Sequence, residues 1–187
     1  MIHIYCDGGC SGNQSEINIG GWGTVLVYKE HIKELKGGTV NTTNNRMELT
    51  ALIEGLRAIQ NVDISVSVYS DSAYIVNCFH QKWHVNWQKN GWRNSKKEPV
   101  ENQDLWVELL QLVQRHPQVL FFKVKGHLDV NHTAEIKKWH AKFINDYGIQ
   151  MPFERYLTGI QYNNRADQLA NEAIDALRSG LGEGTKD

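Results

Sequence analysis

The order of the expected strands and helices constrains this fold more than any other feature of the sequence. Three runs of strand-forming residues come before any helix, and the first alternates Ile2, Ile4 and Cys6 with polar neighbours. Two later strands are separated by stretches with helical spacing. The expected strands are 2–6, 22–28, 32–36, 64–69 and 119–124, and the expected helices start at 45 and cover 72–79, 104–115 and 164–178.

This order predicts a single α/β domain built on a five-stranded mixed sheet flanked by helices. The first three strands should be antiparallel, since short connections join them, whereas the last two need crossovers and should lie parallel to the first. A glycine-rich loop is expected over residues 8–21, and Gly37-Gly38 should end the third strand.

Composition narrows the class of protein further. The net charge is −1, so any nucleic-acid binding must come from a local basic patch. The three cysteines, Cys6, Cys10 and Cys78, have neither zinc-ligand spacing nor a disulfide pattern, which favours a reducing compartment. We see neither a signal segment at the start nor an apolar run long enough for a membrane span, so we expect a cytoplasmic protein without a membrane partner.

Two aspartates follow predicted strands. Asp7 comes after the first strand and Asp71 after the fourth. If these strands are parallel neighbours, both carboxylates lie in the crevice at their carboxyl ends, which is the usual ligand site of open α/β sheets. The alternative for each aspartate is an ordinary turn or helix-cap residue.

Two further carboxylates lie at predicted helix starts. Glu48 shares the sheet-facing stripe of its helix with Leu52, and Asp167 is placed in the first turn of the last helix. The alternatives are a capping box between Asn45 and Glu48, and a favourable interaction of Asp167 with the helix dipole. Four carboxylates in one crevice repel one another unless they share protons or bind cations, and oxygen ligands suit Mg²⁺ or Mn²⁺.

An ordered set of motifs resembles the bacterial type I ribonuclease H family, which carries a basic protrusion. The motifs are Asp7-Gly-Gly-Cys-Ser-Gly-Asn13, Thr42-Thr-Asn-Asn-Arg-Met-Glu48, Ser70-Asp71-Ser72, Trp83-His-Val-Asn-Trp87, Asn90-Gly-Trp92, Asp104-Leu-Trp106, Val124-Lys-Gly-His127 and Asn164-Arg-Ala-Asp167. The resemblance covers most of the chain in the family's order. It implies a ribonuclease H-like fold and endonucleolytic hydrolysis of the RNA strand of an RNA–DNA hybrid, leaving 5′ phosphates.

The resemblance also implies roles for individual residues. It makes Asp7, Glu48, Asp71 and Asp167 the ligands of two Mg²⁺ ions, with Mn²⁺ as a possible substitute, and it makes the protein a monomer. His127 corresponds to the family's loop histidine, which is thought to transfer a proton or help product leave. The alternative is a polar loop residue, and His132 remains a second candidate.

The same motifs imply which residues contact the substrate. The resemblance implies that Asn13, Asn45 and the backbone near Cys10 contact the RNA strand, and that Thr43 and Asn13 bind a DNA phosphate; the Asn44-Asn45 pair can both cap a helix and bind substrate. Two departures weaken the transfer, because Asn41 stands where the family often has Arg and Ala73 where it often has Gln.

The segment 82–99 is the expected basic protrusion that grips the DNA strand. It has no acidic residue between positions 82 and 97, and its tryptophans are expected to hold it together with the cations outward. The alternative is a solvated basic helix. Gln88 and Asn90 replace expected positive charge, so we expect weaker, more salt-sensitive binding. The predicted contacts here are Trp83, Trp87, Lys89, Trp92, Arg93, Lys96 and Lys97.

An insertion separates His127 from Asp167. Residues 128–162 are extra or rebuilt relative to the family, and Ile136, Trp139 and Phe143 have helical spacing. We expect a helical subunit at the rim of the active site, within a single domain of residues 1–178 that ends in a flexible tail, 179–187. The insertion is either a passive elaboration or a lid with extra substrate contacts.

Two rival functions remain at this point. The first is a DNA-acting nuclease or strand-transfer enzyme, because fold alone does not separate such enzymes. The second is a catalytically silent module that binds a hybrid or duplex. Four clustered carboxylates argue against the silent module, because they would repel phosphates.

Overall fold

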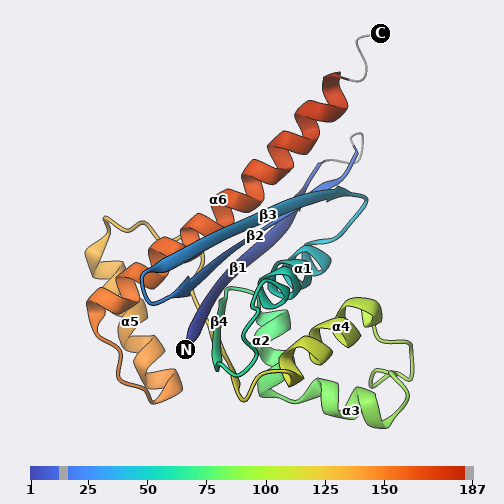
Figure 1. The fold of residues 1–187 in the computed structure, drawn as a ribbon, viewed down its shortest axis with the longest axis horizontal. Coiled ribbons are helices and arrows are strands. Elements are labelled where there is room, and N and C mark those ends of the chain that lie inside the picture. Colours follow the sequence, from blue (N-terminus) through green and yellow to red (C-terminus); the bar gives the residue numbers. More distant parts are fainter. Residues whose placement is uncertain (13–16, 184–187) are drawn as a thin grey trace.

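The computed structural model describes residues 1–12 and 17–183 of the chain (Figure 1). Five strands and six helices are assigned in these residues. In chain order the elements are β1 Ile2–Ser11, β2 Ile19–Tyr28, β3 His31–Val40, α1 Asn44–Arg57, β4 Val66–Ser70, α2 Ala73–His80, α3 Trp83–Lys89, α4 Gln103–Gln114, β5 Val119–Lys123, α5 Thr133–Tyr147 and α6 Phe153–Glu183.

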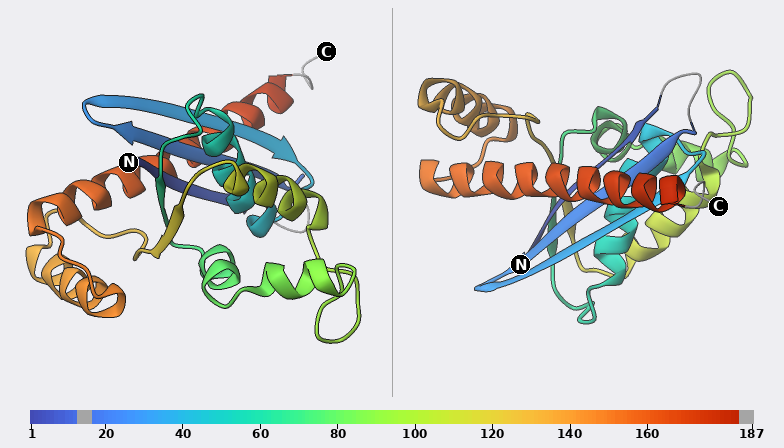
Figure 2. Two further views of the ribbon diagram at one scale, coloured as in Figure 1. Left: turned by 60° about the horizontal axis from the view of Figure 1, so that its bottom comes forward. Right: turned by 90° about the horizontal axis from the view of Figure 1, so that it is seen from above.

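The strands form one mixed sheet in the order β3-β2-β1-β4-β5. The pairs β1–β2 and β2–β3 are antiparallel, and β1–β4 and β4–β5 are parallel, which confirms the predicted topology. Helix α6 packs against β1, β2 and β3 on one face, and α1 packs against β1 and β2 on the other (Figure 2). The sheet therefore separates two hydrophobic clusters, one under α1 and one under α6.

The glycine-rich segments are strands rather than loops, which corrects two expectations. Strand β1 continues to Ser11 and β2 starts at Ile19, and Gly37-Gly38 lies inside β3. The reason is close packing: a Cβ on Gly8 would lie 2.4 Å from the carbonyl carbon of Met47, and one on Gly37 would lie 2.6 Å from the Trp22 indole nitrogen. Gly8 lets α1 approach the sheet, and Gly37 lets the Trp22 indole lie across the neighbouring strand β3.

The N-cap of helix α1 lies two residues before the position that the sequence pattern indicated. Its N-cap is Thr43, whose hydroxyl accepts a hydrogen bond from the Arg46 N–H at 3.2 Å. The expected capping box between Asn45 and Glu48 is therefore wrong, because Asn45 lies inside the helix. Glu48 is thus not needed as a cap.

The last helix is longer than predicted. It spans 31 residues, Phe153–Glu183, and follows Pro152, whereas the expected helix covered 164–178. Gly159 is tolerated inside it because Tyr5 packs there, 3.5 Å from the position a Cβ would take. Asp167 consequently lies well inside α6 instead of in its first turn. Residues 179–183 belong to this helix and not to a tail, and 184–187 lie outside the described residues.

The expected helical subunit is present between β5 and the middle of α6. It consists of α5 and the first turns of α6, which share an apolar cluster with β1 and β4. Phe122 of β5 packs against Phe143 and Tyr147, with ring centroids 5.7 and 5.0 Å away. The segment is therefore part of the folded core. Across the described residues, every helix is too short or too polar to span a bilayer.

Candidate active site

The register of the sheet brings Asp7 and Asp71 together. Parallel pairing between β1 and β4 ends at Tyr5 and Tyr69, and each aspartate lies two residues beyond. Strand β1 continues past Asp7, which pairs with Gly23 of β2, so Asp7 is not the end of its strand as expected. Strand β4 does end at Ser70. The result is a buried Asp7, only 7% exposed, beside the half-buried Asp71.

Glu48 enters the same place from helix α1. One ligand oxygen each from Asp7, Glu48 and Asp71 can be chosen so that all three lie within 4.8 Å of one another. The absence of a side chain on Gly8 permits this approach, since a Cβ there would lie 2.7 Å from the Glu48 backbone nitrogen. Glu48 Oε2 is buried and has no hydrogen-bond partner in the described residues. We call these three residues the carboxylate cluster.

The pKa values of all three carboxyl groups in the carboxylate cluster are raised. Burial, followed by the charge of Asp71, raises the pKa of Asp7 to about 8. Burial and the charge of Asp7 raise the pKa of Glu48 well above its usual range. Burial also raises the pKa of Asp71, and the nearby His127 partly opposes this. The cluster therefore holds protons at neutral pH unless a cation replaces them.

The residues present suit a divalent cation. All three offer hard carboxylate oxygens, the ligand type that Mg²⁺ and Mn²⁺ prefer, and no Cys or His belongs to the cluster. Glu48 Oε2, which accepts no hydrogen bond from the described residues, is available as a metal ligand. Gly126 leaves space beside Asp71, because a Cβ there would lie 2.3 Å from Asp71 Oδ2.

Asp167 and His127 lie at the open side of the cluster. Asp167 is outside the group of three, but its hydrogen bond with Asp7 contributes to the raised pKa of Asp7. His127 Nδ1 lies 3.5 Å from Asp167 Oδ2, and the two side chains are 73% and 33% exposed. His127 has a left-handed φ of 58°, and the loop is fixed by Leu128, whose carbonyl accepts from Asn164 Nδ2 at 2.8 Å.

The second histidine candidate is placed differently. His132 is the N-cap residue of α5, and its Nδ1 lies 3.0 Å from Glu135 Oε2. Its imidazole is thus engaged within α5, whereas His127 faces a predicted metal ligand. This geometry favours His127 as the proton carrier.

The predicted contacts to the hybrid divide into three groups. The Cys10 N–H donates to Asn44 Oδ1 at 2.8 Å, so the two lie together beside the cluster. Asn45 is exposed, and Thr43 is exposed while it caps α1. Asn13 lies outside the described residues.

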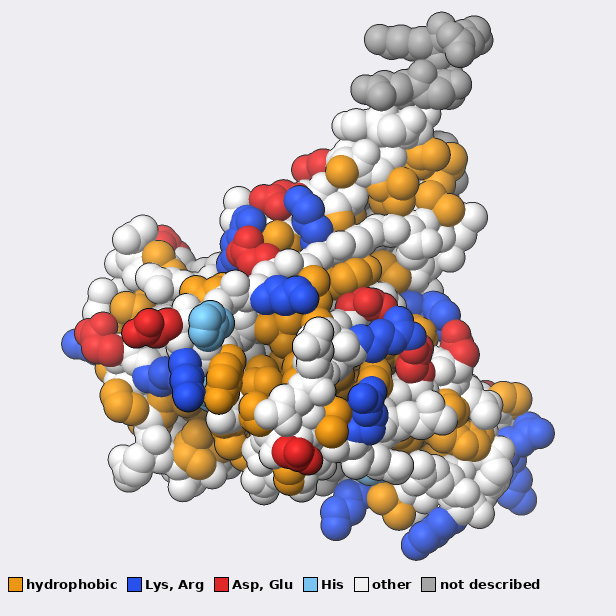
Figure 3. Space-filling view, viewed as in Figure 1, with side chains coloured by type: hydrophobic (Ala, Val, Ile, Leu, Met, Phe, Trp, Pro, Cys, Tyr) orange, Lys and Arg blue, Asp and Glu red, His pale blue; other side chains and the backbone are white. Residues whose placement is uncertain are grey.

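The basic protrusion has the arrangement expected for its tryptophans. Trp87 contacts Trp83, Trp92 and the buried Trp106, with centroid distances of 6.3, 5.9 and 5.5 Å. Cationic side chains project at the lower right of Figure 3, over α3 and the loop that follows it. The exposed cations are Lys82, Lys89, Arg93, Lys96 and Lys97.

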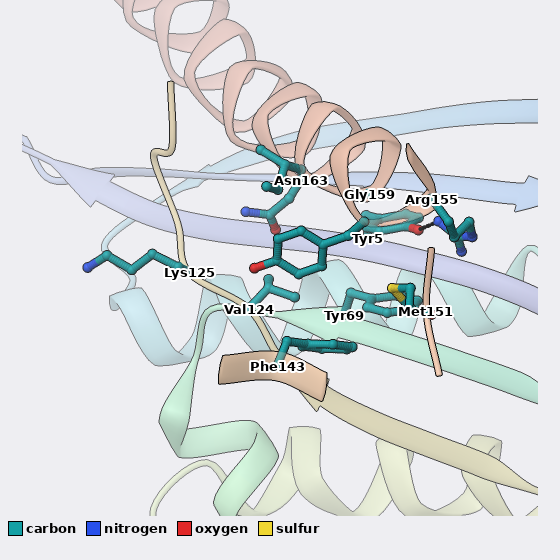
Figure 4. Close-up of a pocket in the computed structure, with 11 residues that line it drawn as sticks. Tyr5, Tyr69, Val124, Lys125, Phe143, Met151, Arg155, Gly159 and Asn163 are labelled. Carbon is teal, nitrogen blue, oxygen red and sulfur yellow. Dashed lines mark hydrogen bonds between the residues drawn. The ribbon is translucent and has the colours of Figure 1, made fainter. Parts of the chain in front are cut away.

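Several residues with a role in this site were not singled out from the sequence. Arg155 of α6 donates to the Tyr5 hydroxyl at 2.8 Å and lies 5.9 Å over the Tyr69 ring (Figure 4). These tyrosines stack with centroids 4.7 Å apart, two residues before Asp7 and Asp71. Arg155 therefore ties the insertion to both strands of the site. Its partners lie 86 or more positions away in sequence, so no local pattern indicates them.

Fold and site define an α/β protein with a carboxylate centre at the junction of parallel and antiparallel strands. A sequence model of RNase H matches residues 1–175. Ribonuclease H of Symbiobacterium thermophilum is 58% identical over 179 residues, covering 96% of this chain and 98% of that protein. Ribonuclease H of Moorella thermoacetica is 46% identical over 177 residues, covering 95% and 93%. The chain belongs to the ribonuclease H family.

Solved structures agree on the fold. LC11-RNase H1 in complex with RNA/DNA hybrid superposes with a TM-score of 0.55 at 23% identity, covering 95% of this chain and 99% of that one. The PFV RNase H domain superposes with a TM-score of 0.60 at 22% identity, covering 94% of each chain. These likenesses concern the fold alone.

Proposed function

We propose that this protein is an endoribonuclease that hydrolyses the RNA strand of RNA–DNA hybrids with two Mg²⁺ ions, which Mn²⁺ can replace. The observation that carries the proposal is the carboxylate cluster, in which Asp7, Glu48 and Asp71 converge without a cationic side chain among them. Membership of the ribonuclease H family supports the same activity.

Each residue of the site has a task in this reaction. Asp7, Glu48 and Asp71 would hold and orient the divalent ions, and Asp167 would complete the ligand set from α6. The ions would supply Lewis-acid chemistry, which polarises a phosphate and activates a water. His127 is exposed and 3.5 Å from Asp167, so it can carry a proton between the site and solvent without rearrangement of the core.

The substrate is held on both sides of the cleavage point. A hybrid differs from a DNA duplex in its 2′-hydroxyls and groove shape. In this proposal the Cys10 backbone, Asn44 and Asn45 contact the RNA strand, which the exposure of Asn44 and Asn45 supports. Thr43 and the protrusion contact the DNA backbone. The groove between Trp83, Trp87, Lys89 and Arg93 has a volume of about 590 Å³, room for a strand along the cations.

The test is incubation of the protein with end-labelled RNA–DNA hybrid, with Mg²⁺ and with EDTA. We expect internal cuts in the RNA strand that carry 5′ phosphates and that require the metal. Asp7→Asn should abolish them, and the exposed Asp63, at the opposite end of β4, provides the matched control Asp63→Asn. Binding without cleavage would support the silent module, and equal cleavage of DNA duplex would support a DNA-acting nuclease.

A further inference from the structure

A second basic groove lies between α2 and the insertion. We call it the insertion groove, and it has a volume of about 270 Å³. One wall is formed by α2 and the other by the end of β5 together with α5. The polar and aromatic side chains that line it include Asn77, His80, Lys123, Lys125, Trp139 and Lys142.

The charge of the insertion groove is positive although the whole chain is not. Lys123, Lys125 and Lys142 are exposed, and Asp146 is the acidic residue along the groove lining. Asp146 pairs with Lys142 at 2.6 Å, which leaves Lys123 and Lys125 without an ion pair among the described residues. Because the net charge of the whole chain is −1, the excess of positive charge is local to the groove.

The geometry of the groove is fixed by its aromatic residues. The Lys125 ammonium lies 5.5 Å from the centre of the Trp139 ring, and that of Lys138 lies 5.8 Å away. In Figure 4 the Lys125 side chain extends away from the aromatic pocket under α6. The Tyr147 hydroxyl accepts from the Lys123 N–H at 2.6 Å, which ties α5 to the end of β5. The cations are therefore partly ordered before any ligand arrives.

The chain leads from the insertion groove directly into the catalytic site. Lys125 precedes Gly126, which lies against Asp71, and His127, which faces Asp167. The groove borders the start of the protrusion, because His80 lies two residues before Lys82, whereas the loop that follows α3 lies toward the opposite end of the molecule from α5 in Figure 1. A nucleic-acid backbone held at the carboxylate cluster thus meets cations in both directions.

We infer that the insertion groove is a second binding surface for the sugar–phosphate backbone of the hybrid, on the side of the cleavage point away from the protrusion. The inference rests on the proposed function and gives the insertion a role in binding. Lys123 and Lys125 contact phosphates, and Trp139 positions Lys125.

The test measures hybrid binding in an Asp7→Asn background at several salt concentrations. The variant Lys123→Gln/Lys125→Gln removes the two groove cations that have no ion pair among the described residues. The control Lys33→Gln/Lys137→Gln removes two exposed lysines outside the groove, one of them on α5. We expect Kd to rise about tenfold for the groove variant, and the slope of log K against log salt to fall by about 2. The control should change Kd less than about twofold.

A second measurement distinguishes a direct contact with phosphates from a general effect of the protein's charge. Hybrids with uncharged methylphosphonates on the side away from the protrusion should bind more weakly to the Asp7→Asn protein. The same methylphosphonates should weaken binding to the groove variant only slightly, because that variant has already lost the lysine–phosphate contacts. In proteins with Asp7 intact, the groove defect should appear in KM rather than in kcat.

The outcomes are distinguishable from those of the proposed function. If the unsubstituted protein leaves hybrid intact with Mg²⁺, the proposed function fails. If it cleaves hybrid and the groove and control variants share Kd, salt slope and methylphosphonate sensitivity, the groove inference alone is overturned. Matching thermal melting curves for both variants exclude misfolding as the cause of a difference.

Discussion

Two parts of the catalytic site differ sharply in their exposure to water. Asp7 and Glu48 form its floor, where Asp7 is 7% exposed and one Glu48 oxygen is buried without a partner. Asp167 and His127 form its rim, and their side chains are 33% and 73% exposed. Burial raises the pKa of both floor residues. The buried floor carboxylates therefore need a cation or protons to offset their charge, whereas the exposed rim side chains are accessible to solvent and substrate.

The largest effect should come from the floor. Asp7→Asn removes a buried ligand at nearly constant volume, and we expect kcat to fall by about three orders of magnitude or more, since metal binding and orientation are lost together. Single-turnover cleavage of hybrid at saturating protein measures this. Asp63→Asn should retain full activity. An Asp7→Asn protein with more than about a tenth of the original rate would contradict the division into floor and rim.

The rim should be more tolerant. His127→Ala removes a proton carrier that is replaceable by water, so we expect kcat to fall about 10²-fold with metal affinity preserved. His132→Ala, on a histidine engaged with Glu135, should change kcat less than about twofold. The comparison of the two variants over a pH series decides the assignment. Equal losses, or a larger loss for His132→Ala, would transfer the role to His132.

The floor should also control the stability of the metal-free protein. The pKa of Asp7 is about 8 in the folded chain and about 3.8 without its environment, so the folded state binds more protons between these values. The stabilising effect of the proton is present at low pH and is lost as pH rises toward 8. We therefore expect metal-free Tm to fall between pH 5.5 and 8, and Mg²⁺ to restore it most strongly at pH 8.

A matched variant isolates this contribution. Asp7→Asn cannot ionise, so its metal-free Tm at pH 8 should exceed that of the unsubstituted protein by about 2–8 °C, corresponding to about 1–2 kcal/mol. Differential scanning calorimetry in EDTA measures both proteins. If the Tm values of the two proteins have the same pH dependence from 5.5 to 8, the Asp7 carboxylate is not the cause of the fall in Tm.

The floor was easier to predict from the sequence than its surroundings were. Asp7 follows a strand pattern with period two and Asp71 follows a β-branched run, so the sequence placed both at one edge of the sheet once their strands were taken as parallel neighbours. Glu48 was placed on the correct face although Thr43, not Asn45, caps its helix. The start of α6 was missed, because Gly159 and aromatic residues hide the helical pattern and only contact with Tyr5 makes them compatible.

The parts that could not be predicted depend on contacts between distant segments. Arg155 and Tyr5 are separated by 150 positions, and their hydrogen bond follows from the path of α6 across the sheet. The insertion groove likewise requires α2 to face α5, and neither helix alone indicates a binding surface. Lys123 and Lys125 lie before the insertion, whose own charges balance, so the sequence did not join them to a basic surface on α5.

The smallest effect concerns the protrusion, which lies outside both the floor and the rim. Lys96 and Lys97 are exposed on the loop after α3, so their contribution is long-range and screened. We expect Lys96→Gln/Lys97→Gln to raise KM about threefold at low salt, with kcat unchanged and the difference shrinking as salt rises. Steady-state cleavage at several salt concentrations measures it, with Lys33→Gln/Lys137→Gln as the charge-matched control. An unchanged KM across the series would remove the protrusion as a grip and leave the insertion groove as the main electrostatic contact, because the carboxylate floor cannot itself attract phosphates without its cations.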